Sequence, residues 1–474
     1  MAELLQPDIC VIGGGSGGLS VAAAAASFGV PVVLIEKNRM GGDCLNSGCV
    51  PSKALIAAAH RTQAARMSGD FGITAQDVAI DFGKVHDHVH GVIKAIAPND
   101  SVARFTGLGV RVIEGEARFT DAETIAVDDR FEIKARRFVV ATGSTPSIPP
   151  IPGLDGTAYL TNETIFDLKQ RPEHLLVIGG GPIGLELAQA FRRLGATVTV
   201  IEAAKALAKE DEECASVVLR RLTADGIDLR TGQTILSVKG GEVIEVSVQT
   251  GRGAETISGS HLLVATGRRP TVDGLDLDKA GIRFEKTGIV VDKGLRTTNK
   301  KVYAVGDVAG GLQFTHAANY HAGLVIRNAL FRLPVAVNND IVPRVTFTDP
   351  ELAHVGLDEV RAKQRHGKIR LLRWPFNEND RAQTERDTTG HVKIVTTRRG
   401  KILGATIVGS QAGELIGLWT LAVTQGLNIR AMTGFVLPYP TRSEAGKRAA
   451  IDFFTPSLTS LWLRRIIRLL RRLG

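Results

Sequence analysis

Two cysteines and a lysine stand close together near the start of the chain, in the run GGDCLNSGCVPSK at residues 41–53. Cys44 and Cys49 are five residues apart, so the two thiols can close a small redox disulfide beside a bound isoalloxazine ring. One thiolate would then face the flavin and the other would exchange with substrate. Lys53 follows Cys49 by four residues and would share its helical face, where its cation lowers the thiol pKa and favours reduced, anionic flavin. The run therefore indicates dithiol redox chemistry.

Two plainer interpretations of this pair remain open: two buried thiols, or half of a metal site. A zinc site needs two further ligands nearby. The other two cysteines, Cys10 and Cys214, are far away in the sequence, the first inside an apolar strand and the second in a helical stretch. Both are most simply small core residues.

The elements that must position this pair include a motif that occurs twice. An apolar run at 8–12 leads into a glycine turn at 13–18, an Ala-rich helix and a strand ending in Glu36. The same order follows at 175–178, in the glycine turn 179–184 and in the strand 197–201, which ends before Glu202. In both units the first glycine, Gly13 or Gly179, precedes the acid by 23 residues.

The spacing of each unit is that of a dinucleotide site. The first glycine makes a tight turn, the second lets the backbone approach a pyrophosphate, and the third lets helix and strand pack closely. The helix N-terminus then holds the phosphates, and the acid accepts hydrogen bonds from ribose hydroxyls. A single such motif can be only a structural turn, but two complete units predict two dinucleotide sites.

Further signals divide the chain. Each unit is followed by an apolar strand that ends in Ala-Thr-Gly, at 141–143 and at 265–267. The Pro-rich segment 147–153 is typical of a crossing between domains, and residues 111–137 alternate as strands do. From about residue 338 the pattern changes, with strands at 391–397 and 401–408 and no dinucleotide motif. We expect an α/β protein with two Rossmann-like domains and a C-terminal α+β domain.

Composition excludes several classes of protein. The chain has 474 residues, 44% hydrophobic and 23% charged, which is typical of a globular protein of roughly three domains. Four cysteines are too few for a secreted disulfide framework. The start MAELLQPD lacks a basic region and no uninterrupted apolar run reaches about 18 residues, so we expect no signal peptide, no transmembrane helix and a cytoplasmic location. The net charge is +9, but aromatics are only 5% and no nucleic-acid motif is present, so we expect no nucleic-acid partner.

Together these motifs resemble the class I pyridine nucleotide–disulfide oxidoreductases, the family that contains lipoamide dehydrogenase, glutathione reductase and mercuric reductase. The resemblance covers about residues 8–455 and also rests on VYAVGD at 302–307 and PRVTFTDPELAHVG at 343–356. It implies FAD in the first unit, a nicotinamide nucleotide in the second and a homodimer formed by the C-terminal domain. The domains would be 1–146 and 268–337 for FAD, 147–267 for the nicotinamide nucleotide, 338–456 for dimerisation, and a tail at 457–474.

The resemblance also implies roles for single residues. Cys49 would be the thiol that faces the flavin, Cys44 the interchange thiol, and Glu186 the acid that pairs with Lys53. Asp307 would hold the FAD ribityl chain and Glu36 the adenosine ribose. We expect no resident metal. The residues expected to contact the two nucleotides are Gly13, Gly15, Ser16, Gly17, Gly18, Glu36, Lys37, Gly41, Gly42, Lys53, Gly115, Ala117, Thr142, Gly143, Ser144, Asp307, Gly179, Gly181, Ile183, Gly184, Glu202 and Gly267.

The choice of nicotinamide nucleotide follows from charge. Glu202 would bond a ribose 2′-hydroxyl and repel a 2′-phosphate. The next residues are alanines and supply no arginine for a phosphate, although Lys205 is near. We therefore expect NADH rather than NADPH.

One catalytic element departs from the family. Most disulfide reductases have a His-Pro-Thr-x-x-Glu run, whose histidine, from the partner subunit, protonates the leaving thiol. Here the run is YPTRSE at 439–444, which keeps Glu444 but has Tyr439 in place of the histidine. Tyrosine has a pKa of about 10 and is a poor base near neutrality. The sequence therefore predicts only the class of electron acceptor, a small disulfide or a soft metal ion. Mercuric reductase also uses a C-terminal cysteine pair, whereas Cys214 is the last cysteine here, which argues against Hg(II).

Two further features stand outside the motifs. His86, His88 and His90 are typical of a solvated surface helix rather than a metal site. In the tail 457–474, five arginines fall within about 120° of a helical wheel, with an apolar side opposite. That side consists of Trp462, Leu463, Ile466, Ile467, Leu469, Leu470 and Leu473. The tail either lies in the interface of an inner membrane surface or packs on its own dimer.

The main hypothesis is that hydride passes from NADH to FAD and then to the Cys44–Cys49 disulfide, with Tyr439 and Glu444 of the partner subunit assisting. A second hypothesis is a membrane-associated flavin NADH:quinone reductase, which would not need the thiols. A third is a non-catalytic protein that keeps FAD for stability and uses the tail to bind a partner or a membrane. The cysteine pair and Lys53 favour the first, since a binding module needs neither.

Overall fold

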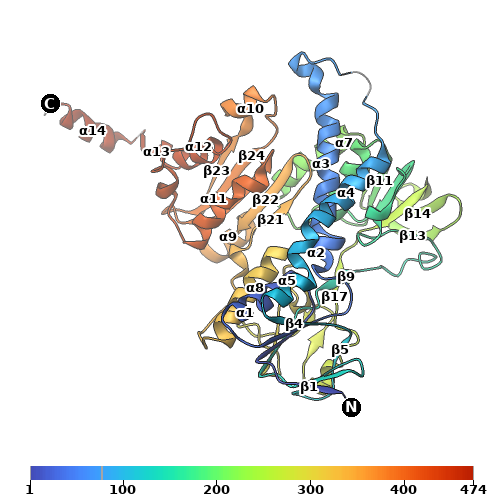
Figure 1. Ribbon diagram of the computed structural model, residues 1–474. Coiled ribbons are helices and arrows are strands. Elements are labelled where there is room, and N and C mark those ends of the chain that lie inside the picture. Colours follow the sequence, from blue (N-terminus) through green and yellow to red (C-terminus); the bar gives the residue numbers. More distant parts are fainter. Residues whose placement is uncertain (1, 76–77, 459, 473–474) are drawn as a thin grey trace. The chain divides into compact units, whose positions relative to one another are not determined.

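The computed structural model describes residues 2–75, 78–458 and 460–472, which form two compact units (Figure 1). The first unit comprises Met1–Lys205 and Ile227–Val337, and the second comprises Ala206–Gly226 and Asn338–Gly474. Among the described residues, no helix has the length and apolar character needed to cross a bilayer.

The first unit is built on a parallel five-stranded sheet in the order β20-β8-β2-β3-β4. Its strands are short and mostly buried, as parallel strands usually are, except that the last strand in this order exposes Arg111 and Glu114. In chain order they are β2 (Ile9–Ile12), β3 (Val32–Glu36), β4 (Val110–Glu114), β8 (Arg137–Val140) and β20 (Val302–Ala304).

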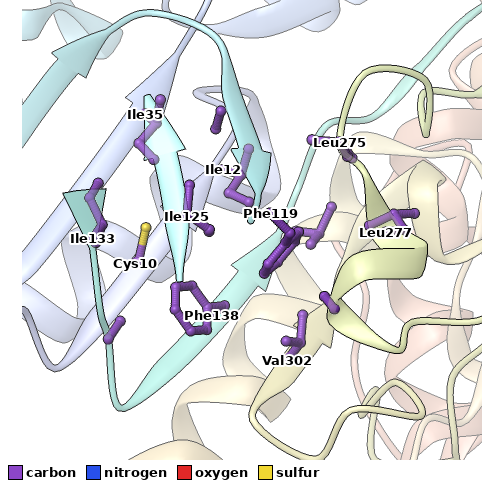
Figure 2. Close-up of a cluster of buried hydrophobic side chains, with 14 of the residues drawn as sticks. Cys10, Ile12, Ile35, Phe119, Ile125, Ile133, Phe138, Leu275, Leu277 and Val302 are labelled. Atoms are coloured by element: carbon purple, nitrogen blue, oxygen red, sulfur yellow. The ribbon is translucent and has the colours of Figure 1, made fainter. Parts of the chain in front are cut away.

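Different layers cover the two faces of this sheet. One face packs on the helices α1 (Ser16–Ser27) and α8 (Thr315–Ala329). The other packs on a small sheet made of β1 (Glu3–Leu5), β5 (Ala117–Phe119), β6 (Ile125–Val127) and β7 (Phe131–Ile133). Figure 2 shows Cys10 in this second core among Ile12, Ile35 and Phe138, and Cys10 is fully buried. Cys10 is thus a core residue, as expected from the sequence.

A second parallel sheet has the order β12-β11-β10-β16. Its strands are β10 (His174–Ile178), β11 (Thr197–Glu202), β12 (Asp228–Thr231) and β16 (His261–Val264), with α6 (Pro182–Arg193) between β10 and β11. An antiparallel meander of β13 (Thr234–Lys239), β14 (Ile244–Thr250) and β15 (Gly253–Gly259) shares a core with it. Two glycine turns, each between a parallel strand and a helix, confirm the predicted α/β class.

The segments that join the two sheets pair with each other. β9 (Ser144–Pro146) follows the first Ala-Thr-Gly, and β17 (Arg268–Pro270) follows the second; the two run antiparallel, with Ser144 opposite Pro270. The cysteine run lies on α2 (Gly42–Asn46) and α3 (Cys49–Arg66), and α3 packs on α4 (Phe82–Ile96) and on α6. The unit also contains α5 (Val102–Gly107) and a two-stranded ribbon of β18 (Phe284–Glu285) and β19 (Gly288–Ile289).

The second unit contains an antiparallel sheet in the order β21-β22-β25-β24-β23. The strands are β21 (Arg344–Thr346), β22 (Glu351–Gly356), β23 (Ile369–Pro375), β24 (His391–Thr397) and β25 (Ile402–Gly409). α11 (Ala412–Thr424) packs on β22 and β25, and α12 (Glu444–Asp452) on β23 and β24 (Figure 1). The remaining helices are α9 (Glu359–His366), α10 (Asp380–Thr384) and α7 (Glu212–Ala224), which groups with this unit although it precedes β12.

The tail forms two helices, α13 (Thr455–Leu458) and α14 (Leu461–Leu470). Within the described part of the tail, α14 has no buried residue. Leu473, which the wheel placed on the apolar side, lies outside the described residues. The finer division of the chain into five segments stays a proposal.

Candidate active site

The first glycine of each dinucleotide unit turns tightly against the Ala-Thr-Gly strand. Gly13 has φ +109° and Gly179 has φ +116°. A Cβ atom on either would lie 2.4 Å from a carbonyl oxygen, that of Ala141 or that of Ala265. No side chain fits there, so glycine is required for both conformation and space.

The other glycines of the motif differ in what surrounds them. A Cβ on Gly18 would lie 1.9 Å from the Gly13 oxygen, because the helix starts directly against the turn. In the second unit the corresponding distance, from Gly184 to the Gly179 oxygen, is 2.2 Å. Around the middle glycine of this unit, Gly181, a Cβ would meet nothing within 4 Å among the described residues. That open backbone at a helix N-terminus suits the close approach of a pyrophosphate.

The two acids occupy equivalent positions at their strand ends. Glu36 accepts the Gly14 N–H at 2.6 Å with one oxygen and the Asn38 N–H at 2.7 Å with the other. Glu202 accepts the Gly180 N–H at 2.7 Å and the Ala204 N–H at 2.8 Å in the same way. Each carboxylate is therefore fixed by two backbone N–H groups, and each oxygen keeps a second lone pair for a ribose hydroxyl.

The cysteine pair combines a half-buried thiol with an exposed one. Both thiols are free, with Cys44 half-buried in α2 and Cys49 exposed at the start of α3. The Cys49 Sγ lies 3.5 Å from the Oγ1 of Thr315, the first residue of α8. Thr315 could not be predicted from the sequence, because no local motif marks it.

The electrostatics of the pair distinguish its two members. A hydrogen bond from Cys44, with smaller contributions from the Thr315 hydroxyl and the Lys53 charge, lowers the pKa of Cys49 to about 6. The same hydrogen bond and partial burial raise the pKa of Cys44 well above its usual range. The reduced pair therefore holds its thiolate on Cys49 at neutral pH.

Lys53 and Glu186, which the resemblance paired, lie together. The Lys53 Nζ is 2.7 Å from the Glu186 Oε2, and Glu186 is only 6% exposed. This ion pair joins α3 to α6, so the helix that carries Cys49 is tied to the helix of the second glycine turn.

Asp307 lies at the end of β20, in a short 3-10 turn. The Ser144 hydroxyl donates to its Oδ2 at 2.6 Å. Burial raises the pKa of Asp307, and this hydrogen bond opposes the rise. The structure thus brings together two predicted nucleotide-binding residues that are 163 positions apart.

The remaining predicted nucleotide-binding residues of the first sheet surround its glycine turn. Ser16 and Gly17 begin α1, and Gly15 is its N-cap. Gly41 and Gly42 have positive φ, and the Gly41 N–H donates to the Gly14 oxygen. The others are placed as follows: Lys37 pairs with Glu116, the Gly115 N–H donates to the Glu36 oxygen, Ala117 is buried in β5, and the Thr142 hydroxyl donates to the Thr271 oxygen.

Two positive-φ glycines end the Ala-Thr-Gly strands. At Gly143 and at Gly267 a Cβ would meet nothing within 4 Å among the described residues. Ile183, in the first turn of α6, is 40% exposed.

Tyr439 and Glu444 belong to the second unit. The Tyr439 hydroxyl donates to the Asp380 Oδ2 at 2.8 Å, and its side chain is 70% exposed. Asp380 raises the pKa of the phenol further, which keeps it protonated. Glu444 is the first residue of α12, and its side chain accepts the Thr441 N–H at 3.4 Å. Asp380 is a partner of Tyr439 that the sequence analysis did not identify.

Other candidate ligands have structural partners. Cys214 is buried in α7, 3.5 Å from the His391 Nε2. The rings of His86 and His90 lie side by side on α4, tilted by 42°, with ring centres 4.2 Å apart. Across the described residues, no group of three or more His, Cys, Asp or Glu side chains could hold a metal ion.

Comparison with known proteins gives a consistent result over nearly the whole chain. Residues 7–322 match the family described as pyridine nucleotide-disulphide oxidoreductase, and residues 342–450 match its dimerisation domain. A mercuric reductase from Bacillus cereus is 37% identical over 94% of this chain and 71% of its own length. A dihydrolipoyl dehydrogenase from Geobacillus stearothermophilus is 34% identical over 94% of this chain and 96% of its own.

Solved structures extend the match. LpdA from Mycobacterium tuberculosis superposes with a TM-score of 0.87 at 28% identity, covering 94% of this chain and 99% of that one. The Cu(II) complex of the HOCl-induced flavoprotein disulfide reductase RclA from Escherichia coli gives 0.84 at 28% identity, covering 96% and 100%.

Proposed function

Because this chain belongs to the pyridine nucleotide-disulphide oxidoreductase family, we propose that it passes electrons from NADH through the Cys44–Cys49 pair to a small disulfide or a soft metal ion. The chain is a flavin-dependent disulfide oxidoreductase that works with NAD(P)H. Its matched dimerisation domain supports a homodimer. The family assignment favours this function over a thiol-independent quinone reductase and over a non-catalytic binding protein.

The residues of the first glycine turn fit FAD. Glu36 is fixed by backbone N–H groups at the position expected for a ribose, and the Ser144 hydroxyl orients Asp307. Among the described residues, no atom lies closer than 3.8 Å to the Cβ position of the middle glycine, Gly15. Bound FAD supplies a two-electron carrier between the nicotinamide and the cysteine pair. The second glycine turn, with Glu202, would hold the nicotinamide nucleotide.

The lowered pKa of Cys49 is the observation that carries the proposal. Two electrons and one proton convert the disulfide into a Cys49 thiolate and a Cys44 thiol, which is the protonation state that the site favours. Lys53, fixed by Glu186, stabilises the thiolate with its charge. Cys44 is then the thiol that exchanges with a disulfide or binds a soft metal ion.

Tyr439 of the partner subunit would act as a hydrogen-bond donor at the exchange step, with Glu444 of the partner subunit assisting. A phenol whose pKa is raised by Asp380 does not serve as a base at neutral pH. By turning its O–H from Asp380, it can orient a leaving thiolate with a hydrogen bond, or it can lie beside a bound metal ion.

Single thiol replacements test the proposal. We expect Cys44→Ser and Cys49→Ser to keep FAD and to lose NADH-driven reduction of a small disulfide or Hg(II) by at least about a hundredfold. Cys214→Ala, a buried thiol of the other unit, should behave as wild type. Full disulfide and Hg(II) reduction by Cys44→Ser would contradict the proposed path, and quinone reduction that survives in both variants would favour the quinone hypothesis.

NADH is the proposed donor because Glu202 presents a fixed negative charge where a 2′-phosphate would lie. Both of its oxygens are anchored by backbone N–H groups, so the side chain cannot turn away at low cost. A phosphate at this point would meet the carboxylate directly.

The tail carries a separate proposal, contact with an anionic membrane surface. Leu461 and Trp462 are 73% and 71% exposed, and α14 buries none of its described residues. Five arginines without an acid in 457–474 complement anionic headgroups. A second copy of the chain is the competing occupant of the apolar side.

A further inference from the structure

The segment between the redox cysteines is anchored by one acid, Asp43. Its Oδ1 accepts the Ser47 hydroxyl at 2.8 Å and the Asn162 amide at 3.1 Å. The same amide also donates to the Ser47 carbonyl at 3.1 Å. The other carboxylate oxygen, Oδ2, lies 3.1 Å from the Nη2 of Arg268. Asn162 and Arg268 come from segments more than 100 residues away, so tertiary contacts hold this turn.

Arg268 reaches in the other direction to the flavin-binding carboxylate. Its Nε donates to the Ser144 hydroxyl at 2.8 Å, and its Nη2 donates to the Ser144 carbonyl at 2.8 Å. The Ser144 hydroxyl in turn donates a hydrogen bond to Asp307. Arg268 Nε is also 3.9 Å from Asp307 itself. The Arg268 guanidinium thus connects Asp43 with Asp307. Each donor named in this hydrogen-bond network has an acceptor.

The geometry suits arginine and no other residue. The side chain is only 11% exposed, so its charge needs compensation from both acids. Its planar fork supplies the separate donors that Ser144 and Asp43 require, whereas lysine has a single nitrogen. The pairing of β9 with β17 brings Ser144 and Arg268 onto neighbouring strands, so the backbone presets this contact.

We propose that Arg268 is a positioning residue, which sets the Cys44–Cys49 segment against the flavin-binding carboxylate by bridging Asp43 and Asp307. This inference rests on the proposed function, in which the cysteine pair accepts electrons from the flavin side. Arg268 touches neither cysteine in the described contacts; it acts through Asp43.

The contact between Arg268 and Asp43 should change the pKa of Cys49, which can be measured. The negative charge of Asp43 raises the pKa of both cysteines and of Asp307. Arg268 offsets that charge, so its loss leaves Asp43 uncompensated and opposes formation of the Cys49 thiolate. The sign is therefore fixed: without Arg268 the pKa of Cys49 rises, and with Asp43 neutral it falls.

The test is alkylation of the dithiothreitol-reduced full-length holoenzyme by iodoacetamide across pH, with the labelled cysteine identified by peptide mass spectrometry. For Arg268→Met we expect the midpoint of Cys49 labelling to rise by about half to one pH unit. Asp43→Asn should lower it, and adding Asp43→Asn to Arg268→Met should remove most of the rise. Arg269→Met is the matched control, because the neighbouring Arg269 is 61% exposed and pairs with Asp273 instead.

A second measurement separates positioning from charge. Arg268→Lys keeps the cation, so we expect a near wild-type labelling midpoint with NADH-driven turnover at least about tenfold lower. An unchanged midpoint in Arg268→Met, or full turnover in Arg268→Lys, would overturn the inference. Labelling does not depend on turnover, so failure of the proposed electron path would instead show as activity retained in Cys44→Ser.

Discussion

Glu202 is the residue that we propose selects NADH over NADPH. Both of its oxygens are held by backbone N–H groups, in the same arrangement as Glu36. Replacement by alanine would leave those N–H groups unpaired, whereas glutamine retains one oxygen as an acceptor. Glutamine is therefore the substitution that removes the charge with least disturbance to the turn.

For Glu202→Gln we expect the ratio of kcat/KM for NADH over NADPH to fall by about 10- to 100-fold, because a charged hydrogen bond is lost and a repulsion is relieved. Steady-state kinetics with both nucleotides would measure this. Glu242→Gln, an exposed acid in the β13–β14 turn, serves as the control. A ratio that stays at the wild-type value would show that Glu202 does not select the nucleotide.

For Tyr439, the sequence predicts the weak basicity of the side chain but not its hydrogen-bond partner. The run at 439–444 shows that tyrosine replaces histidine, and a reference pKa suffices to predict a poor base. The structure adds Asp380, which accepts the phenol hydrogen and raises the pKa further. Asp380 lies 59 residues away, at the start of α10, and no local pattern connects it with Tyr439.

At the scale of elements, the strand–glycine–helix units could be predicted because their reasons are local. The positive φ of Gly13 and the contact of Gly18 with the Gly13 oxygen both arise within one turn of chain. The spacing in the sequence records that geometry directly, so two units could be identified without a structure.

A methyl group at Gly18 should disrupt the first unit. A Cβ there would lie 1.9 Å from the Gly13 oxygen, a backbone atom that cannot move without shifting the turn. For Gly18→Ala we expect purified protein with sharply reduced FAD content and a loss of stability of about 1–3 kcal/mol. Absorbance of released FAD and thermal unfolding would measure both.

Gly91→Ala is the matched control for this change. Gly91 lies within α4, and its Cβ would meet nothing within 4 Å among the described residues. Alanine there should retain FAD and stabilise the helix by up to about 1 kcal/mol. Normal FAD content and unfolding in Gly18→Ala would show that the helix start can yield, against the proposed role of the third glycine.

Contacts between distant segments could not be predicted in this way. Thr315, Asn162 and Arg268 approach the cysteine run from three separate parts of the chain. Each contact depends on how the strands of the first unit are ordered, not on the spacing of neighbouring residues. Arg268 follows directly after the second Ala-Thr-Gly, which marks its position in the chain but not its partners.

For the whole molecule, the repeat, the cysteine run and the family resemblance correctly indicated an α/β oxidoreductase. The change of pattern near residue 338 correctly indicated a separate C-terminal domain. The grouping of α7 with the second unit was not foreseen, because α7 lies between two strands of the second parallel sheet in sequence. Its Asp211 N-cap pairs with the buried Lys393 of β24 at 2.7 Å, a contact that only the folded chain reveals.

We expect the tail at 457–474 to bind anionic membranes. Removal of residues 457–474 should abolish sedimentation of the holoenzyme with vesicles that contain phosphatidylglycerol, and pure phosphatidylcholine vesicles should bind neither form. NADH-driven turnover should be unchanged, because the catalytic residues lie elsewhere. A full-length protein that stays in the supernatant with both vesicles, but whose oligomeric state changes on truncation, would assign the apolar side to a second copy.

Anaerobic titration of the FAD-loaded protein with NADH would show whether electrons from NADH reach the Cys44–Cys49 disulfide. After two electrons, we expect a long-wavelength absorption band from the Cys49 thiolate against oxidised flavin, absent in Cys49→Ser. Because the pKa of Cys49 is about 6, the band should fade as the pH falls through that value. Bleaching of the flavin by the first two electrons without this band would show that the cysteines are not in the path.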